Sequence, residues 1–95
     1  MKYERHCDRT RAILGKTFPQ VHEWLDQIAW EGGAFNPHHR RYRHHAQGVE
    51  QVRIMWGDDA AKAAQRHILD DLFGPTAEDI ALIPADEAEF VAGGY

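Results

Sequence analysis

The segment 59-DAAKAAQRHILDDLF-73 carries the clearest helical pattern in the chain. Its apolar residues recur at steps of three and four, which places them on one side of an α-helix. They are Ala60, Ala61, Ala64, Ile68 and Leu72. Gly74 and Pro75 end the pattern, since proline does not continue a helix. The segment therefore predicts an amphipathic helix over about residues 59–73.

Segments on both sides of it also have helical features. The predicted helices run over 3–14, from Pro19 to about Trp30, and from Pro37 or His38 to about Trp56, with a last short turn around Phe90 and Val91. Prolines at first turns and glycines after last turns are typical of helix ends. No stretch alternates long enough to indicate a strand. We expect an all-α fold, a small bundle of three to four helices with short connections.

Three tryptophans are expected to supply much of the core of this bundle. Trp24 lies on the apolar face of the second predicted helix, and Trp56 continues the stripe of Val49 and Val52 on the third. Trp30 lies near the end of the second helix. Aromatic side chains of this size contribute strongly to small cores.

Length and composition limit the classes of protein to consider. The 95 residues suit a single domain over 1–95, and 43% hydrophobic with 27% charged residues is typical of a folded chain. We expect no membrane span, because no apolar run approaches about 18 residues. The charged start is unlike a signal peptide and Cys7 is a single cysteine, so we expect a cytoplasmic location. The sequence has no serine, which excludes a serine nucleophile.

Histidine is the unusual component, with seven residues in the chain. His22 and Asp26 are four residues apart, and so are His67 and Asp71, so each pair shares a helix face. Both pairs lie at the border of an apolar stripe. Because a buried carboxylate is costly unless it is paired or coordinates a metal, these pairs are candidate metal ligands.

The third predicted helix adds two more candidates. His45 falls within the stripe of Val49 and Val52, and His44 lies on its flank beside Gly48. Imidazole and carboxylate ligands without sulfur favour a divalent transition metal, with zinc first and iron, manganese or nickel as alternatives. The competing interpretation is that these side chains form surface pairs or a polar core whose hydrogen bonds are satisfied.

Arg40 and Arg43 are three residues apart beside these histidines. They are either a solvated helix face or a clamp for a small phosphorylated ligand, since guanidinium groups bind phosphate oxygens in pairs. With a metal, a clamp would indicate hydrolysis of a phosphate ester or nucleotide. Whichever of Asp70 and Asp71 is not a ligand would then accept the proton, if burial raises its pKa. The alternative is an ion that only joins the helices.

The order of these motifs resembles a family of small uncharacterised bacterial and phage helical proteins. The matching segments are Val21–Asp26, Asn36–Arg40, Arg43–Gly48 and His67–Leu72, followed by Ile83-Pro84. By position, the resemblance implies these site residues: His22, Asp26, His39, Arg40, Arg43, His44, His45, His67 and Asp71. It also matches His6 to an N-terminal histidine of the family. The chain departs from the pattern at Asp70 and Phe90, and the resemblance brings no established activity.

A non-enzymatic module is the second interpretation, in which the basic face of the third helix binds an acidic surface of a protein partner. A homo-oligomer is also compatible with the sequence. Binding to nucleic acid is disfavoured, because the net charge is −4 with neutral histidines and there is no basic tail.

Overall fold

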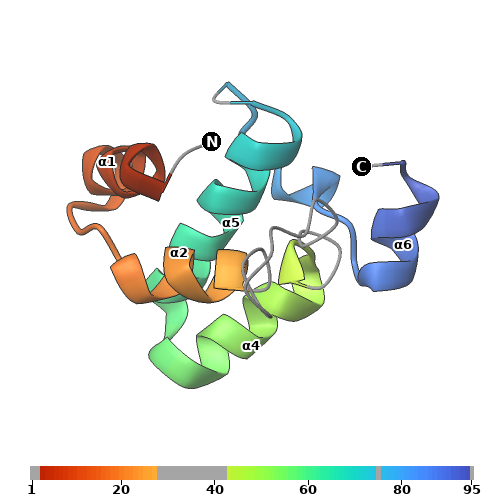
Figure 1. Ribbon diagram of the computed structural model, residues 1–95, viewed down its shortest axis with the longest axis horizontal. Coiled ribbons are helices and arrows are strands. Elements are labelled where there is room, and N and C mark those ends of the chain that lie inside the picture. The colour runs from red at the N-terminus through yellow and green to blue at the C-terminus, as the bar shows by residue number, and fades with distance from the viewer. Residues whose placement is uncertain (1–2, 28–42, 75, 95) are drawn as a thin grey trace.

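The computed structural model describes residues 3–27, 43–74 and 76–94 of the chain (Figure 1). Within these ranges it contains helices and no strand, which confirms the predicted all-α fold. The elements are α1 (Tyr3–Leu14), α2 (Pro19–Asp26), α4 (Ala46–Trp56), α5 (Asp58–Leu72), the 3₁₀ helix η2 (Ile80–Leu82) and α6 (Glu87–Ala92). The described residues thus form five α-helices, more than the three to four expected. None of these helices has the length and apolar character needed to span a membrane.

Helix α5 runs through the middle of the molecule and contacts α1, α2, α4 and η2 (Figure 1). Asp58 and Asp59 in its first turn favour its start, because carboxylates stabilise the positive end of the helix dipole. Four of the six buried apolar residues of α5 are alanines, Ala60, Ala61, Ala63 and Ala64, and the other two are Ile68 and Leu69. Small side chains let neighbouring helices approach closely, so α5 is the element around which the others are arranged.

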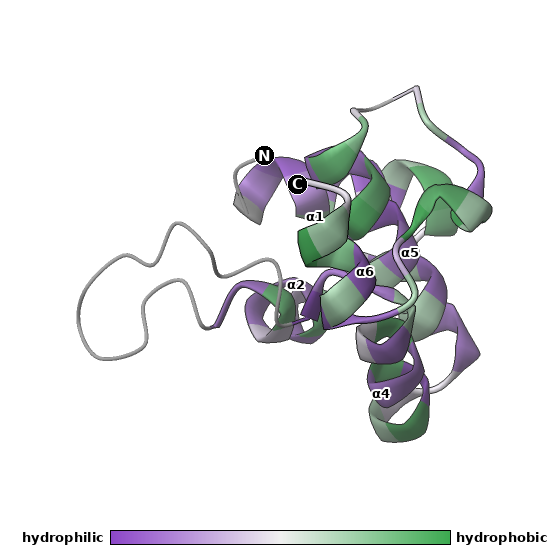
Figure 2. Ribbon diagram, turned by 90° about the vertical axis from the view of Figure 1, so that its right-hand side faces the viewer, coloured by the Kyte–Doolittle hydropathy of each residue, from purple (hydrophilic) through white to green (hydrophobic). Residues whose placement is uncertain are grey.

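The core around α5 is aliphatic, and the tryptophans contribute less than expected. Val21 and Leu25 of α2 and Val52 of α4 are fully buried, whereas Trp56 is 40% exposed and Trp24 only partly buried. Trp30 lies outside the described residues. The prediction for Trp56 is wrong because the alanine side of α5 is already covered by the smaller residues of α2 and α4. In Figure 2, hydrophobic and hydrophilic residues share the surfaces of α4 and α5, as expected of helices that pack on one side.

The third predicted helix is interrupted within the described part of the chain. Helix α4 starts at Ala46 and the residues before 43 are outside the described part, while His44 and His45 form a bend. His45 caps the helix, with its Nδ1 accepting a hydrogen bond of 3.0 Å from the backbone N–H of Gly48. The placement of His44 and His45 on a helix face was therefore wrong. Gly57 joins α4 to α5 with φ of 97°, a conformation that favours glycine.

Candidate metal centre

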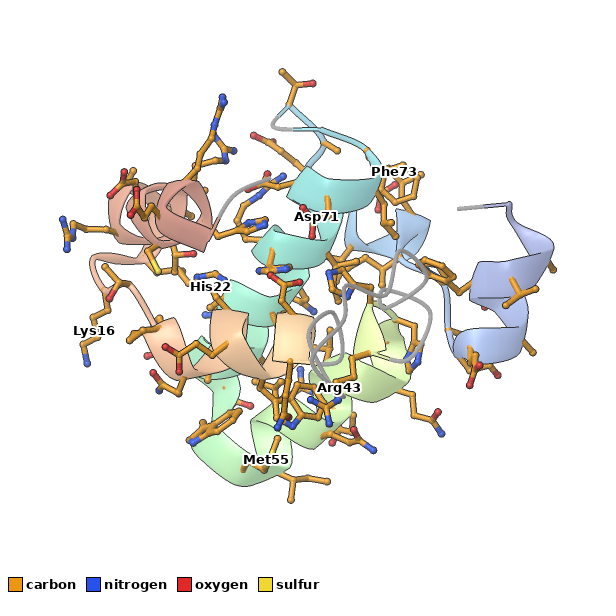
Figure 3. The ribbon with its side chains drawn as sticks, viewed as in Figure 1. Lys16, His22, Arg43, Met55, Asp71 and Phe73 are labelled. Carbon is orange, nitrogen blue, oxygen red and sulfur yellow. The ribbon has the colours of Figure 1, made fainter. Side chains whose placement is uncertain are left out.

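Seven polar side chains meet between α1, α2, α5 and the bend before α4. We call them the histidine cluster: His6, Thr10, His22, Asp26, His44, His67 and Asp71. Three helices each contribute two members one turn apart, a spacing that points both side chains the same way. In Figure 3, His22 of α2 and Asp71 of α5 lie within the body of the molecule, whereas Lys16 points away from it.

Four members have ligand atoms that all lie within 4.8 Å of one another, namely Asp26, His44, His67 and Asp71. We call them the four-ligand group. Nε2 of His67 is 3.2 Å from Oδ2 of Asp71 and 3.3 Å from Oδ1 of Asp26. Nε2 of His44 is 3.0 Å from Oδ2 of Asp71 and 3.7 Å from Oδ1 of Asp26. The two rings are inclined by 64°, so lone pairs in their planes can converge on one point.

A second set, His6, His22 and His67, also has ligand atoms within 4.8 Å. The rings of His6 and His67 are stacked, with centroids 3.7 Å apart and planes inclined by only 15°. A metal bound by imidazole lies close to the ring plane, and two stacked planes do not meet between the rings. This second set is therefore a poor metal site, and the four-ligand group is the candidate.

A chain of hydrogen bonds reaches Nδ1 of His67, the ring nitrogen that does not face Asp26 and Asp71. The Thr10 hydroxyl donates to the backbone oxygen of His6 over 2.8 Å, so it accepts from Nε2 of His22 over 2.9 Å. Nδ1 of His22 then carries a lone pair and accepts from Nδ1 of His67, 2.8 Å away. With its Nδ1 protonated, His67 presents Nε2 to Asp26 and Asp71 either as an imidazolium N–H or as a lone pair for a metal.

Burial and pairing set the charges of the histidine cluster. Burial lowers the pKa of His22 to about 4, reinforced by the neighbouring charges of His67 and His6. Burial also lowers the pKa of His44 to about 4, against the opposing effect of Asp71, and lowers that of His6. For His67, burial acts in the same direction, but contacts with Asp26 and Asp71 outweigh it and raise the pKa.

The pKa values of the two carboxyl groups are also lowered, which favours their charged form. Burial alone would raise the pKa of Asp71, but close contacts with His44, His6 and His67 hold it well below its usual range. His67 likewise lowers the pKa of Asp26 against the effect of burial. These contacts thus favour the imidazolium form of His67 between two carboxylates, and one imidazolium leaves an excess of negative charge in the interior. A divalent cation is attracted to such a site.

The structure separates the other predicted site residues from the four-ligand group. Asp70 points to two arginines instead, accepting from Nε of Arg9 over 2.7 Å and from Nε of Arg66 over 2.9 Å. It is adjacent to Asp71, but one helical step of about 100° turns it to another face. The expected carboxyl group with a raised pKa is not Asp71, because histidine contacts lower its pKa. His45 caps α4 as described.

Arg43 is engaged beside the cluster rather than within it. Its Nη1 donates to the backbone oxygen of Trp24 over 2.6 Å and to Oε1 of Gln27 over 2.8 Å. The guanidinium carbon also lies 4.2 Å from the centre of the Trp24 ring. The predicted partner in a phosphate clamp, Arg40, and the predicted ligand His39 lie outside the described residues.

Reasoning from apolar stripes missed two residues of the cluster, Thr10 and His6. His6 is 1% exposed, and its Nε2 lies 3.1 Å from Oδ1 of Asp71, off the direction of a hydrogen bond. Within the described part of the chain, neither of its ring nitrogens has a hydrogen-bond partner. Its helix buries a polar pair, His6 and Thr10, with the same four-residue spacing as His22 and Asp26. That repeated spacing is the signal in the sequence.

Comparisons with known proteins bear on the family. No curated protein and no solved structure matches the chain. A model of one protein family matches residues 1–92, and its description is a domain of unknown function, DUF6915. The match covers nearly the whole chain, consistent with the resemblance to an uncharacterised family. The chain therefore belongs to the DUF6915 family.

Proposed function

We propose that this chain is a metal-binding domain that holds one divalent transition metal ion, zinc first, between Asp26, His44, His67 and Asp71. The observation that carries the proposal is the spacing of the ligand atoms. In a tetrahedron with metal–ligand bonds of 2.0–2.1 Å, ligand atoms lie about 3.3–3.4 Å apart. The four separations between a histidine nitrogen and an aspartate oxygen in the group are 3.0, 3.2, 3.3 and 3.7 Å, on both sides of that value.

Charge supports the same conclusion. Two carboxylates balance a divalent cation, and His67 would lose its Nε2 proton when it binds the ion. The buried excess of negative charge would then disappear, which is favourable in a medium of low polarity.

The surrounding hydrogen bonds also suit a metal. Histidines that bind metals usually donate their second ring N–H to a partner that fixes the tautomer. The chain from Thr10 through His22 to Nδ1 of His67 supplies such a partner. It directs the Nε2 lone pair of His67 into the four-ligand group.

The role that we propose for the ion is to join α2, α5 and the bend before α4. Four protein ligands complete a tetrahedral zinc site, as in zinc ions that stabilise folds. The hydrolytic role expected from the sequence depends on free arginines, and Arg43 is already bound to Trp24 and Gln27. A stabilising ion is therefore the stronger proposal than a phosphate-ester hydrolase.

The test compares two neighbouring aspartates in untagged protein purified in the presence of zinc. Wild type and Asp70→Asn should each contain about one metal equivalent by elemental analysis, whereas Asp71→Asn should contain less than about a tenth. Asp70→Asn is the matched control, because it removes a buried carboxylate of the same helix that pairs only with arginines in the described structure. The same analysis identifies iron, manganese or nickel if one of these replaces zinc. Wild-type protein without any transition metal would refute the proposal.

A further inference from the structure

We infer that Asp26 is an exchangeable ligand of this metal, and that its coordination position accepts a small external carboxylate. This inference rests on the proposed function and adds a binding site to it. The other three ligands, His44, His67 and Asp71, would hold the ion permanently. Two imidazoles and one carboxylate are a ligand set with which zinc proteins keep a fourth position open for water or substrate.

Exposure distinguishes Asp26 from the rest of the group. Its side chain is 28% exposed, against 2% for Asp71 and 0% for His44 and His67. Water or a solute therefore reaches the group on the Asp26 side. A ligand that already contacts solvent loses less when it leaves the metal, because its carboxylate is hydrated again at once.

The distances between the histidines and the two aspartates also indicate that Asp26 is held less firmly than Asp71. The two separations that involve Asp26 are the longest of the four, 3.3 and 3.7 Å, compared with 3.2 and 3.0 Å for Asp71. Asp71 is also approached by a third histidine, since Nε2 of His6 lies 3.1 Å from its Oδ1. Histidines on three sides hold Asp71 in place, whereas Asp26 lies at the open edge of the group.

The chemistry of the lost ligand identifies what can replace it. A carboxylate that arrives from solvent supplies the same oxygen ligand and the same negative charge that Asp26 provides. The charge balance between the ion and its ligands is then retained when Asp26 leaves.

The experiment uses Co²⁺, whose visible spectrum reports the coordination of the ion. Wild type, Asp26→Ala and Asp26→Asn are loaded with Co²⁺ and titrated with acetate, and far-UV circular dichroism checks that each variant is folded. Glu23→Ala is the matched control, because it removes an exposed carboxylate one turn earlier on α2. We expect both Asp26 variants to bind Co²⁺ at least roughly tenfold more weakly than wild type. Acetate should shift their spectra towards that of wild type and restore most of the lost affinity, while Glu23→Ala behaves as wild type.

The outcomes separate the two proposals. If wild type takes up no Co²⁺ or Zn²⁺, the proposed function fails and the inference fails with it. If wild type binds Co²⁺ but folded Asp26→Ala and Asp26→Asn do not, Asp26 is indispensable and only the inference is overturned. Variants that bind Co²⁺ with spectra unchanged by acetate would overturn it as well.

Discussion

Asp70 and Asp71 show how one step along a helix gives two carboxylates different chemistry. The Asp71 carboxylate is within 3.2 Å of three imidazole nitrogens, from His6, His44 and His67. Asp70, equally buried, pairs with Arg9 and Arg66. The pair with Arg9 connects α5 to α1 and the pair with Arg66 lies within α5. The imidazoles, in contrast, surround Asp71 with ligands that a metal can use. Adjacent aspartates therefore stabilise the fold in one case and form the candidate metal centre in the other.

At this scale the first prediction concerns Thr10. Thr10→Val keeps the shape of the side chain but removes the hydroxyl that accepts from Nε2 of His22 and donates to the backbone of His6. His67 would lose the support that fixes its tautomer, so zinc affinity should fall by about 10- to 100-fold, as measured by competition with a chromogenic chelator. Thr10→Ser retains the hydroxyl and should stay close to wild type. Equal zinc affinity in the valine and wild-type proteins would contradict the hydrogen-bond chain.

At the scale of elements, local signals in the sequence determined most helices. The segment 3–14 was predicted and α1 spans Tyr3–Leu14, while the prediction of 59–73 corresponds to α5 at Asp58–Leu72. Glycines and prolines mark these ends and act within a few residues. The pairs on α2 and α5 were also visible, because their spacing is a property of one helix. How the helices bring His6 and His44 to the same point is a matter of tertiary packing.

Tertiary contacts, and not the local sequence, determine the residue at which α4 begins. The backbone N–H groups of Ala46 and Gln47 donate to the carbonyl oxygens of Pro84 and Ala85, over 2.7 and 3.0 Å. These residues are nearly forty positions away in sequence, so no local pattern contains this information. The bonds satisfy N–H groups that a helix start leaves open. The helix therefore begins at Ala46, and His44 remains in the bend where it meets Asp71.

The second prediction tests this bend through Gly48. A Cβ atom at Gly48 would overlap the backbone oxygen of Arg43 and lie 2.9 Å from its carbonyl carbon. Gly48→Ala should therefore displace residues 43–45, lower the free energy of unfolding by roughly 1–3 kcal/mol and reduce zinc binding through His44. Chemical denaturation and zinc titration measure the two effects.

Gly15→Ala is the control for glycine removal, because a Cβ there has no neighbour within 4 Å among the described residues, although its φ of 79° adds some strain. It should retain zinc binding, and a Gly48→Ala protein with full zinc affinity would contradict the role of the bend.

At the scale of the whole molecule, the interior is unusually polar for a chain of 95 residues. Four of its buried apolar residues on α5 are alanines, and five histidines are buried in the described part. Small domains with limited apolar cores often depend on a metal or another cross-link for stability. An ion between α2, α5 and the bend before α4 would serve this purpose. Without the ion, the same histidines make the fold sensitive to acid.

The last prediction is that the metal-free protein loses stability as the pH falls from 7 to 5. A histidine with a lower pKa in the folded than in the unfolded state binds fewer protons when folded, so acid favours unfolding below the ordinary pKa of 6.5. With pKa values of about 4, His22 and His44 should each cost on the order of 2 kcal/mol at pH 5. His6 acts in the same direction, and His67, whose pKa is raised, opposes them. Asp26 and Asp71 change little in this range, because their lowered pKa values and the unfolded value of 3.8 all lie below it.

Thermal unfolding in a chelator should therefore show Tm falling steadily from pH 7 to pH 5. His22→Gln removes one of the groups responsible, so its Tm should depend less steeply on pH than that of wild type, whatever its absolute stability. Gln51→Ala is the control, since it changes an exposed side chain that carries no titratable group. Its slope with pH should stay close to that of wild type. A wild-type Tm that is constant or rises on acidification would show that these histidines are already protonated in the folded state, and would contradict the charges assigned to the cluster.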